Sequence, residues 1–229
     1  MSSNPNTQSP VNPLPPVVVA LFLVIVGVEA AFSLGAKGFI GGPGALGWRN
    51  SAIQTYGFNS DIMGWMFANG RFPQEHMIRF VSYIFVHGDF THALFGGAMI
   101  LALGKFVGDV FNQWATLALV LISSIVGALV FGLIAPEQPW LTGAFPGVYG
   151  LIGGFTYLMW LKLGQMGERQ YRAFTLIGFL LGIQLVFGLL FGSNSTWLAD
   201  LAGFGAGFLA SFFLSPGGFR KLREKIRHE

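Results

Sequence analysis

The sequence LTGAFPGVYGLIGG, residues 141–154, lies near the middle of the chain between two apolar segments. Pro139 and Gly143 interrupt the chain around its start, and Pro146 stands where a new helix is expected to begin. In a membrane protein, the unpaired backbone N–H groups of such a helix start can surround a reactive group. The residues found there are Phe145 and Pro146, and neither side chain can act as a nucleophile, an acid or a base.

The composition around this stretch is typical of a polytopic membrane protein. Of the 229 residues, 53% are hydrophobic and 10% are charged, and the mean hydropathy is +0.61, whereas soluble domains carry about 25% charged residues. The absence of cysteine excludes disulfides and cysteine-ligated metals. The single dense basic run is short and adjoins an apolar span, so membrane lipid is the expected partner and nucleic acid is not.

Apolar windows of about 20 residues, the length that crosses a membrane, occur six times. The expected spans are 16–35, 77–103, 113–135, 144–163, 173–191 and 197–214. We therefore predict an all-α fold, a polytopic bundle of six transmembrane helices over residues 16–215. Residues 1–15 are uncharged and proline-rich, which indicates a disordered tail, and residues 216–229 form a basic tail.

The connection over residues 36–76 is rich in glycine and aromatic side chains and carries isolated charges. This composition favours an interfacial segment with short helices in the headgroup region. The basic residues favour a multi-pass protein of the cell membrane with both termini in the cytoplasm. Nine of them would then be cytoplasmic: Lys105, Lys162, Arg169, Arg172, Arg220, Lys221, Arg223, Lys225 and Arg227. Four would lie outside: Lys37, Arg49, Arg71 and Arg79.

Small residues recur at helical spacing in two of the spans. The sixth span has Ala199, Gly203 and Gly207 on one face, and the fourth has a run of glycines, namely Gly143, Gly147, Gly150, Gly153 and Gly154. Small residues let two helix backbones approach closely, which matters because lipid provides no hydrophobic drive for helices to associate. We predict that these two helices are central and pack against each other.

Ionisable side chains within spans are candidate functional groups because their burial is costly. They are Glu29, His87, Asp89, His92 and Asp200. A metal site would need a third ligand such as Asp200 beside the two histidines, and the usual ligand spacing is missing, so no metal or other cofactor is expected. The alternative is structural: His87 would hydrogen-bond a loop, His92 a buried carbonyl, and Glu29 would reach the interface. A proton or ion path through Glu29 and Asp200 is a further possibility.

Three segments in this order resemble motifs of the rhomboid family of intramembrane serine proteases. RFVSYIFVHGDFTHALFGG (79–97) is similar to the second-span motif, in which histidine, four residues, histidine, three residues and asparagine follow one another. GAFPGVYGLIG (143–153) resembles the fourth-span motif around the serine, and ADLAGFGAG (199–207) the sixth-span motif in which a histidine precedes a glycine pair. The resemblance runs from about residue 79 to 214 and implies the six-span fold with a long first connection. The family's catalytic groups are a serine–histidine dyad with hydrogen-bond donors for the oxyanion.

Carried over residue by residue, the resemblance implies that the reactive members of this site are replaced. The serine position holds Phe145, and the next residue is Pro146, which has no backbone N–H. The histidine position holds Asp200, and the oxyanion asparagine position holds Gly96. Losing the nucleophile alone costs several orders of magnitude in rate, so the resemblance implies an inactive member, a pseudoprotease.

Other residues of the family pattern persist. Tyr149 matches the aromatic neighbour of the dyad histidine, and His92 and His87 match the second-span histidines. If the fold is kept, Asp200 and His92 face the same cavity, and we predict a direct or water-bridged contact between them. Other hydroxyls, none at the start of the fourth span, are Ser82, Ser123, Ser124, Thr142 and Ser211.

Three function classes follow from these observations. The resemblance implies a protein that binds transmembrane segments of client proteins through a lateral opening without cleaving them. A rhomboid-type serine endopeptidase with non-standard residues stays open, as does a small transporter or channel. Against the last class stand the few intramembrane charges and the lack of a detectable inverted repeat.

Overall fold

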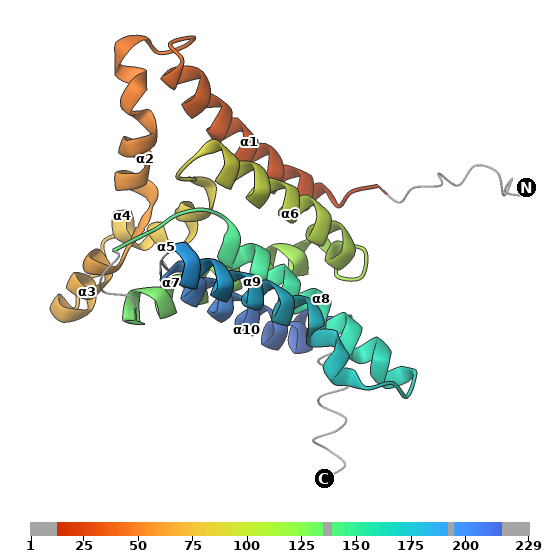
Figure 1. Ribbon diagram of the computed structural model, residues 1–229. Coiled ribbons are helices and arrows are strands. Elements are labelled where there is room, and N and C mark those ends of the chain that lie inside the picture. Colours follow the sequence, from red (N-terminus) through yellow and green to blue (C-terminus); the bar gives the residue numbers. More distant parts are fainter. Residues whose placement is uncertain (1–12, 135–138, 192–194, 217–229) are drawn as a thin grey trace, which may run out of the picture.

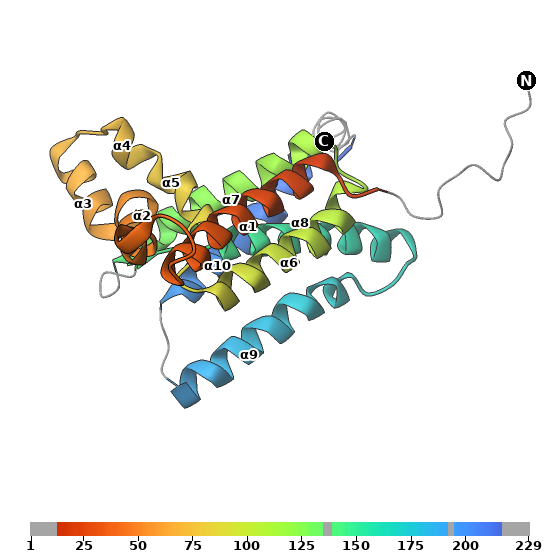
Figure 2. The same cartoon turned by 90° about the horizontal axis from the view of Figure 1, so that it is seen from above.

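The computed structural model describes residues 13–134, 139–191 and 195–216. Six long helices run along one axis in alternating directions (Figure 1): α1 (Pro16–Ala36), α6 (Phe90–Gly108), α7 (Gln113–Ile134), α8 (Phe145–Gln165), α9 (Thr175–Phe191) and α10 (Thr196–Leu214). The start of α1 and the end of α10 therefore lie at the same end of the bundle (Figure 2). Nearly all of the predicted terminal tails, 1–15 and 216–229, lies outside the described residues.

Short elements occupy the opposite end, which we call the first-loop end and define by the helices of residues 42–85. They are η2 (Gly42–Gly47), α2 (Trp48–Tyr56), α3 (Ser60–Asn69), α4 (Gln74–Met77), α5 (Arg79–Ser82) and η3 (Tyr83–Phe85). Strand β1 (Phe58–Asn59) pairs antiparallel with β2 (Trp140–Leu141), just before α8. The first connection is thereby tied to the start of α8. A further short helix, η4 (Gln170–Phe174), joins α8 to α9.

The all-α, polytopic membrane class is confirmed. Four described helices, α1, α6, α7 and α10, are long and apolar enough to cross a membrane. Helix α9 has 17 residues, and α8 is rich in glycine, so the count of six spans stays a prediction.

The predicted second span, residues 77–103, is wrong as a single helix. Residues 86–89 are not helical. Helix α6 begins at Phe90, where the Asp89 carboxylate accepts a hydrogen bond from the His92 backbone N–H at 2.9 Å. An aspartate at this N-cap position satisfies a donor of the first turn that has no partner within the helix. Asp89 is therefore a helix cap, and the two histidines of the motif lie on either side of the helix start.

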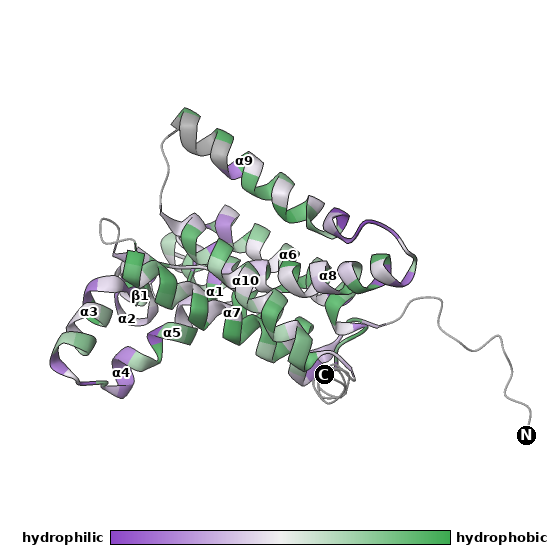
Figure 3. Ribbon diagram, turned by 90° about the horizontal axis from the view of Figure 1, so that it is seen from below, coloured by the Kyte–Doolittle hydropathy of each residue, from purple (hydrophilic) through white to green (hydrophobic). Residues whose placement is uncertain are grey.

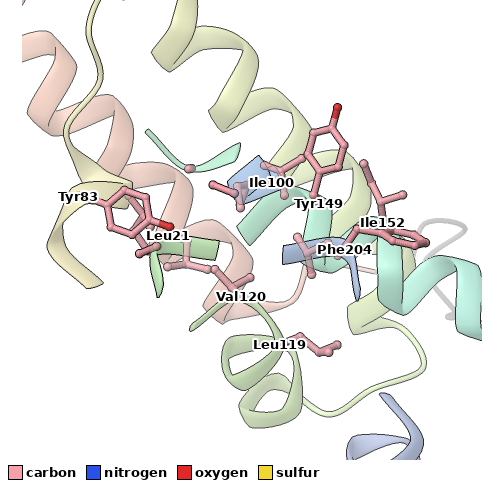
Figure 4. Packing of buried hydrophobic residues seen from close by; sticks show 14 of the residues in the cluster. Leu21, Tyr83, Ile100, Leu119, Val120, Tyr149, Ile152 and Phe204 are labelled. Atoms are coloured by element: carbon pink, nitrogen blue, oxygen red, sulfur yellow. The ribbon is translucent and has the colours of Figure 1, made fainter. Parts of the chain in front are cut away.

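Helices α7, α8 and α10 form the centre of the bundle, and α8 and α10 share its most extensive contact. Their glycine stripes pack against each other, which confirms the prediction: a Cβ atom added at Gly153 or Gly207 would meet backbone of the facing helix. On the α7 side, a Cβ at Gly147 would lie 2.9 Å from the Ser124 hydroxyl. Figure 4 shows buried side chains of four helices meeting in this core, among them Ile100, Val120, Ile152 and Phe204.

Helix α9 is packed differently. Figures 2 and 3 show it set apart along one side of the bundle. Its first turns contact the core through Ile177, which is buried, and through Phe174 of η4, whose ring lies 5.4 Å from that of Phe208. Farther along, Phe179 is 66% exposed and Leu190 70% exposed. Among the described side chains of α9, the apolar ones beyond its first turns therefore face outward.

Candidate functional site at the start of α8

Helix α8 begins after a tight turn at Gly143. The backbone there has φ +93°, a conformation that favours glycine, and an added Cβ would lie 2.5 Å from Cε1 of His92. The Gly143 N–H donates to the Tyr83 carbonyl at 2.9 Å, and the Tyr83 hydroxyl donates to the Ser124 carbonyl of α7 at 2.8 Å. The turn is therefore held against η3 and α7, and it places Phe145 as the first residue of α8.

His87 holds the same turn from the other side. Its side chain is 1% exposed, and its Nε2 accepts the backbone N–H of Ala144 at 3.2 Å. An accepting Nε2 carries no proton, so the ring is neutral. Burial, reinforced by the neighbouring His92, lowers the pKa of His87 to about 4, while a backbone hydrogen bond with Phe85 acts in the opposite direction. His87 lies before α6 and serves as an acceptor that positions the start of α8.

His92 is covered by Phe145. The two rings are stacked, with centroids 5.1 Å apart and planes 24° from parallel. The His87 ring meets His92 edge-on at 5.0 Å. Gly96 lies beside the same pair, since an added Cβ would be 3.1 Å from Nε2 of His87. The four positions are therefore brought together as the motifs predict, and the Phe145 ring occupies the place next to His92.

Asp200 has a different neighbourhood. Its side chain is 6% exposed, and Oδ2 accepts a hydrogen bond at 3.2 Å from Nε2 of Gln184 on α9. The Tyr149 side chain is close enough to interact electrostatically with Asp200 and Gln184. A direct or water-bridged contact was predicted between Asp200 and His92. No direct hydrogen bond or ion pair joins them among the described residues, and the water-bridged form stays a prediction. Gln184 supplies the donor for the aspartate, and the histidine ring instead stacks on Phe145.

Glu29 forms a buried ion pair with Arg49, whereas the sequence had suggested that it would simply reach the membrane interface. It is 5% exposed and accepts two hydrogen bonds from Arg49, Nη1 to Oε2 at 2.8 Å and Nη2 to Oε1 at 2.7 Å, and a third from Ser33 at 2.7 Å. Arg49 Nη1 also donates to the His87 carbonyl at 2.8 Å. The hydrogen bonds with Glu29 raise the pKa of Arg49, which lies in the first connection. This guanidinium therefore joins α1, α2 and the turn before α6.

No metal ligand set is found in the part of the chain that the structure describes, and four of the other serines lie in contacts between or within helices. No three histidine, aspartate or glutamate side chains come close enough there to hold an ion. Three of the other serines donate to backbone carbonyls: Ser82 to Tyr56, Ser124 to Val120 and Ser211 to Gly207. Ser123 lies between α7 and Gly150 of α8. Those hydroxyls therefore belong to helix packing.

Sequence reasoning placed His87, His92, Gly96 and Phe145 together and missed two partners. Arg49 was assigned only as an outer charge, and Gln184 was not singled out. A lone glutamate in one span and a lone glutamine in another are the signals that could have found them, because each needs a hydrogen-bond partner in a membrane.

The comparisons with known proteins agree with this geometry. A family model described as the Rhomboid domain matches residues 74–217, which is more than half of the chain. It covers α4 to α10 and all three motif segments. A search of curated proteins finds no match. The chain belongs to the rhomboid family.

Proposed function

We propose that this rhomboid-family protein binds transmembrane segments of client proteins and does not cleave them. The observation that carries the proposal is the Phe145 ring stacked on His92 at the position where the family pattern has its serine. Phenylalanine has no atom that can attack a carbonyl. Cleavage by the family's mechanism needs the serine, whereas binding of a transmembrane segment does not. Binding without cleavage therefore fits this site.

The other replacements support the same conclusion. Asp200 stands at the position of the general base and bonds Gln184, so no imidazole at that position can take and return a proton. Gly96 has no side-chain donor for an oxyanion, and Pro146 has no backbone N–H. Without nucleophile and base, enzymes of this kind retain only the small rate enhancement that comes from substrate binding and oxyanion donors.

The surroundings of α9 support the binding half of the proposal. Helices in lipid associate through close packing and polar contacts. Helix α9 has exposed apolar side chains, and its Gln184 forms a polar pair with Asp200 of α10. The proposal places the protein in the cell membrane with both termini cytoplasmic. Lys105, Lys162, Arg169 and Arg172 belong to the end of the bundle at which α1 starts and α10 ends, as the positive-inside rule requires.

The test combines capture and cleavage. A photoreactive amino acid is placed at Ile183 of α9 or at Phe67 of α3, both of which are exposed. It should crosslink single-pass membrane proteins in cells, in larger amounts than a control protein in which the sequence of the probed segment is scrambled. Purified protein in liposomes should leave labelled transmembrane substrates intact. The variant Phe145→Ser should also leave them intact, because Asp200 and Gly96 remain.

Two outcomes would replace the proposal. Cleavage by the unmodified protein that Asp200→Ala abolishes would establish a protease of unusual chemistry. Absence of capture together with proton or solute flux that depends on Glu29 or Asp200 would establish a transporter or channel.

A further inference from the structure

We propose that Asp200 recognises a basic side chain, lysine or arginine, carried by the transmembrane helix of a client. The inference rests on the proposed function and names the class of client. It assigns a role to the polar pair behind α9, which the inactive site beside it does not use.

Asp200 and Gln184 together have more hydrogen-bond acceptors than donors. Asp200 is buried, and a carboxylate can accept several hydrogen bonds, yet the one bond found for it comes from the Gln184 amide. Gln184 Oε1 is itself buried without a partner among the described residues. Tyr149, the other close neighbour, has a hydroxyl group and brings no positive charge. Among the described side chains no lysine, arginine or histidine forms an ion pair with Asp200.

The two buried carboxylates of the long helices, Glu29 and Asp200, differ in their partners. Glu29, the other buried carboxylate of the spans, is fully supplied with donors by Arg49 and Ser33. A buried carboxylate without a cation is costly in a membrane, and so is a basic residue in the membrane span of a client. Pairing the two lowers both costs, because hydrogen bonds between charged groups are about twice as strong as those between neutral groups.

Asp200 is accessible from the side of α9. Gln184 is the only described side chain that donates to Asp200, and it belongs to α9, which has the fewest contacts of the six long helices in the part of the chain that the structure describes. A client helix that enters between α9 and α10 and displaces the Gln184 amide would present its basic group directly to the carboxylate. The exchange requires α9 to separate from α10.

The position of Asp200 also predicts where the basic residue lies. Asp200 is the fifth residue of α10, whose start lies at the first-loop end. At about 1.5 Å per residue, its carboxylate lies about one helical turn into the span. The client's lysine or arginine should therefore occur about one turn from the corresponding end of its own span.

The experiment uses the full chain in phosphatidylcholine vesicles and synthetic leucine–alanine helices of membrane-spanning length. Each helix carries lysine, leucine or glutamate one turn from both ends, so that the direction of insertion does not matter. Binding is measured by fluorescence energy transfer to a dye at Ile183. We expect about tenfold tighter binding of the lysine helix than of the leucine helix, and the weakest binding for the glutamate helix.

Two variants of the polar pair then test Asp200 directly. Asp200→Asn keeps the side-chain shape and should reduce the preference for lysine to within about twofold. Gln184→Leu removes the competing donor and should increase the preference for the lysine helix over the leucine helix severalfold. A pair that only holds α9 in place would instead shift the binding of all three helices together, in the same direction in both variants.

The remaining outcomes separate the two proposals. Equal binding of the three helices by the unmodified protein would overturn the inference and leave the proposed function standing. Binding of none would overturn both. The comparison of helices on the unmodified protein needs no substitution, so it decides the question even if a variant fails to fold.

Discussion

Helices α8 and α9 follow each other in the chain and are held in opposite ways. Helix α8 lies between α7 and α10, where glycines bring backbones into contact. Helix α9 lies along the side of the bundle, with Phe179 and Leu190 exposed and Gln184 bonded to Asp200. Small residues fix α8 through many close contacts, whereas a few side chains position α9. The comparison teaches that the fold depends on the first arrangement, while the proposed binding of clients depends on the second.

The replaced site belongs to the tightly packed region. Phe145 begins α8, and its turn is held by Tyr83, His87 and Gly143. These contacts involve the backbone of Gly143 and Ala144 and the side chain of His87, and not the Phe145 ring. The proposed loss of catalysis is therefore compatible with a stable family fold.

The largest expected effect comes from adding a methyl group between α8 and α10. Gly207→Ala would place a Cβ against the backbone of Gly150, and because neither backbone can move aside, the free energy of unfolding should fall by about 3 kcal/mol. Unfolding in mixed micelles with increasing detergent denaturant measures this loss.

Two glycines serve as controls for this substitution. Gly205 lies on the same helix and Gly182 on α9, and an added Cβ meets no atom within 4 Å at either position. Alanine at these sites should leave stability unchanged or raise it by up to about 1 kcal/mol through helix propensity. Equal losses at Gly207 and Gly182 would show that the two regions are packed alike.

A smaller effect tests whether the first connection shares in the tight packing. Arg49→Ala leaves Glu29 buried without its cation. Removing one partner of a buried pair costs several kcal/mol, and because the Arg49 side chain is partly exposed we expect about 2 kcal/mol. The same unfolding assay on Arg71→Ala, an exposed arginine of the same connection, should show almost no change. If Arg49→Ala behaves like this control, the connection is not coupled to the bundle.

The packing of α8 against α10 could be predicted from the sequence, because it depends on the spacing of residues within each helix. The glycine spacing of 147–154 and 199–207 predicted the α8–α10 contact because helical periodicity alone determines which residues share a face. The motifs likewise placed Phe145 beside His92. The pair of Glu29 and Arg49 joins residues 20 positions apart through a folded loop, and no spacing rule relates them. The Gln184–Asp200 bond depends on which face of α9 is turned towards α10. The apolar residues of α9 do not predict that face, because apolar side chains can face either lipid or protein.

An acid-sensitive contact gives a third, smaller test at the turn before α8. His87 is neutral in the folded protein, with its pKa lowered to about 4 by burial, against about 6.5 when unfolded. The unfolded chain therefore binds more protons in this window, so stability decreases as the pH falls from about 6.5 towards 4. At about pH 5.5 the loss should be about 1 kcal/mol relative to neutral pH.

Thermal unfolding across this pH range, compared with that of His87→Gln, isolates the histidine. Glutamine cannot gain a proton and can still accept a hydrogen bond from Ala144, so its profile should be flatter by the contribution of His87. If the two proteins lost the same stability as the pH falls, protonation of His87 would not destabilise the turn before α8.

The smallest effect is expected on α9 itself. Phe179 is 66% exposed, so Phe179→Ala removes few protein contacts and should change the free energy of unfolding by less than about 0.5 kcal/mol. Phe131 of α7 is fully buried and packs edge-on against Phe58, and Phe131→Ala should cost about 2 kcal/mol or more through the cavity it leaves. A large loss at Phe179 would mean that α9 is held by packing as close as that of α8. A client helix could then not reach Asp200 without unfolding part of the core, because the displacement of Gln184 requires α9 to separate from the bundle at low cost.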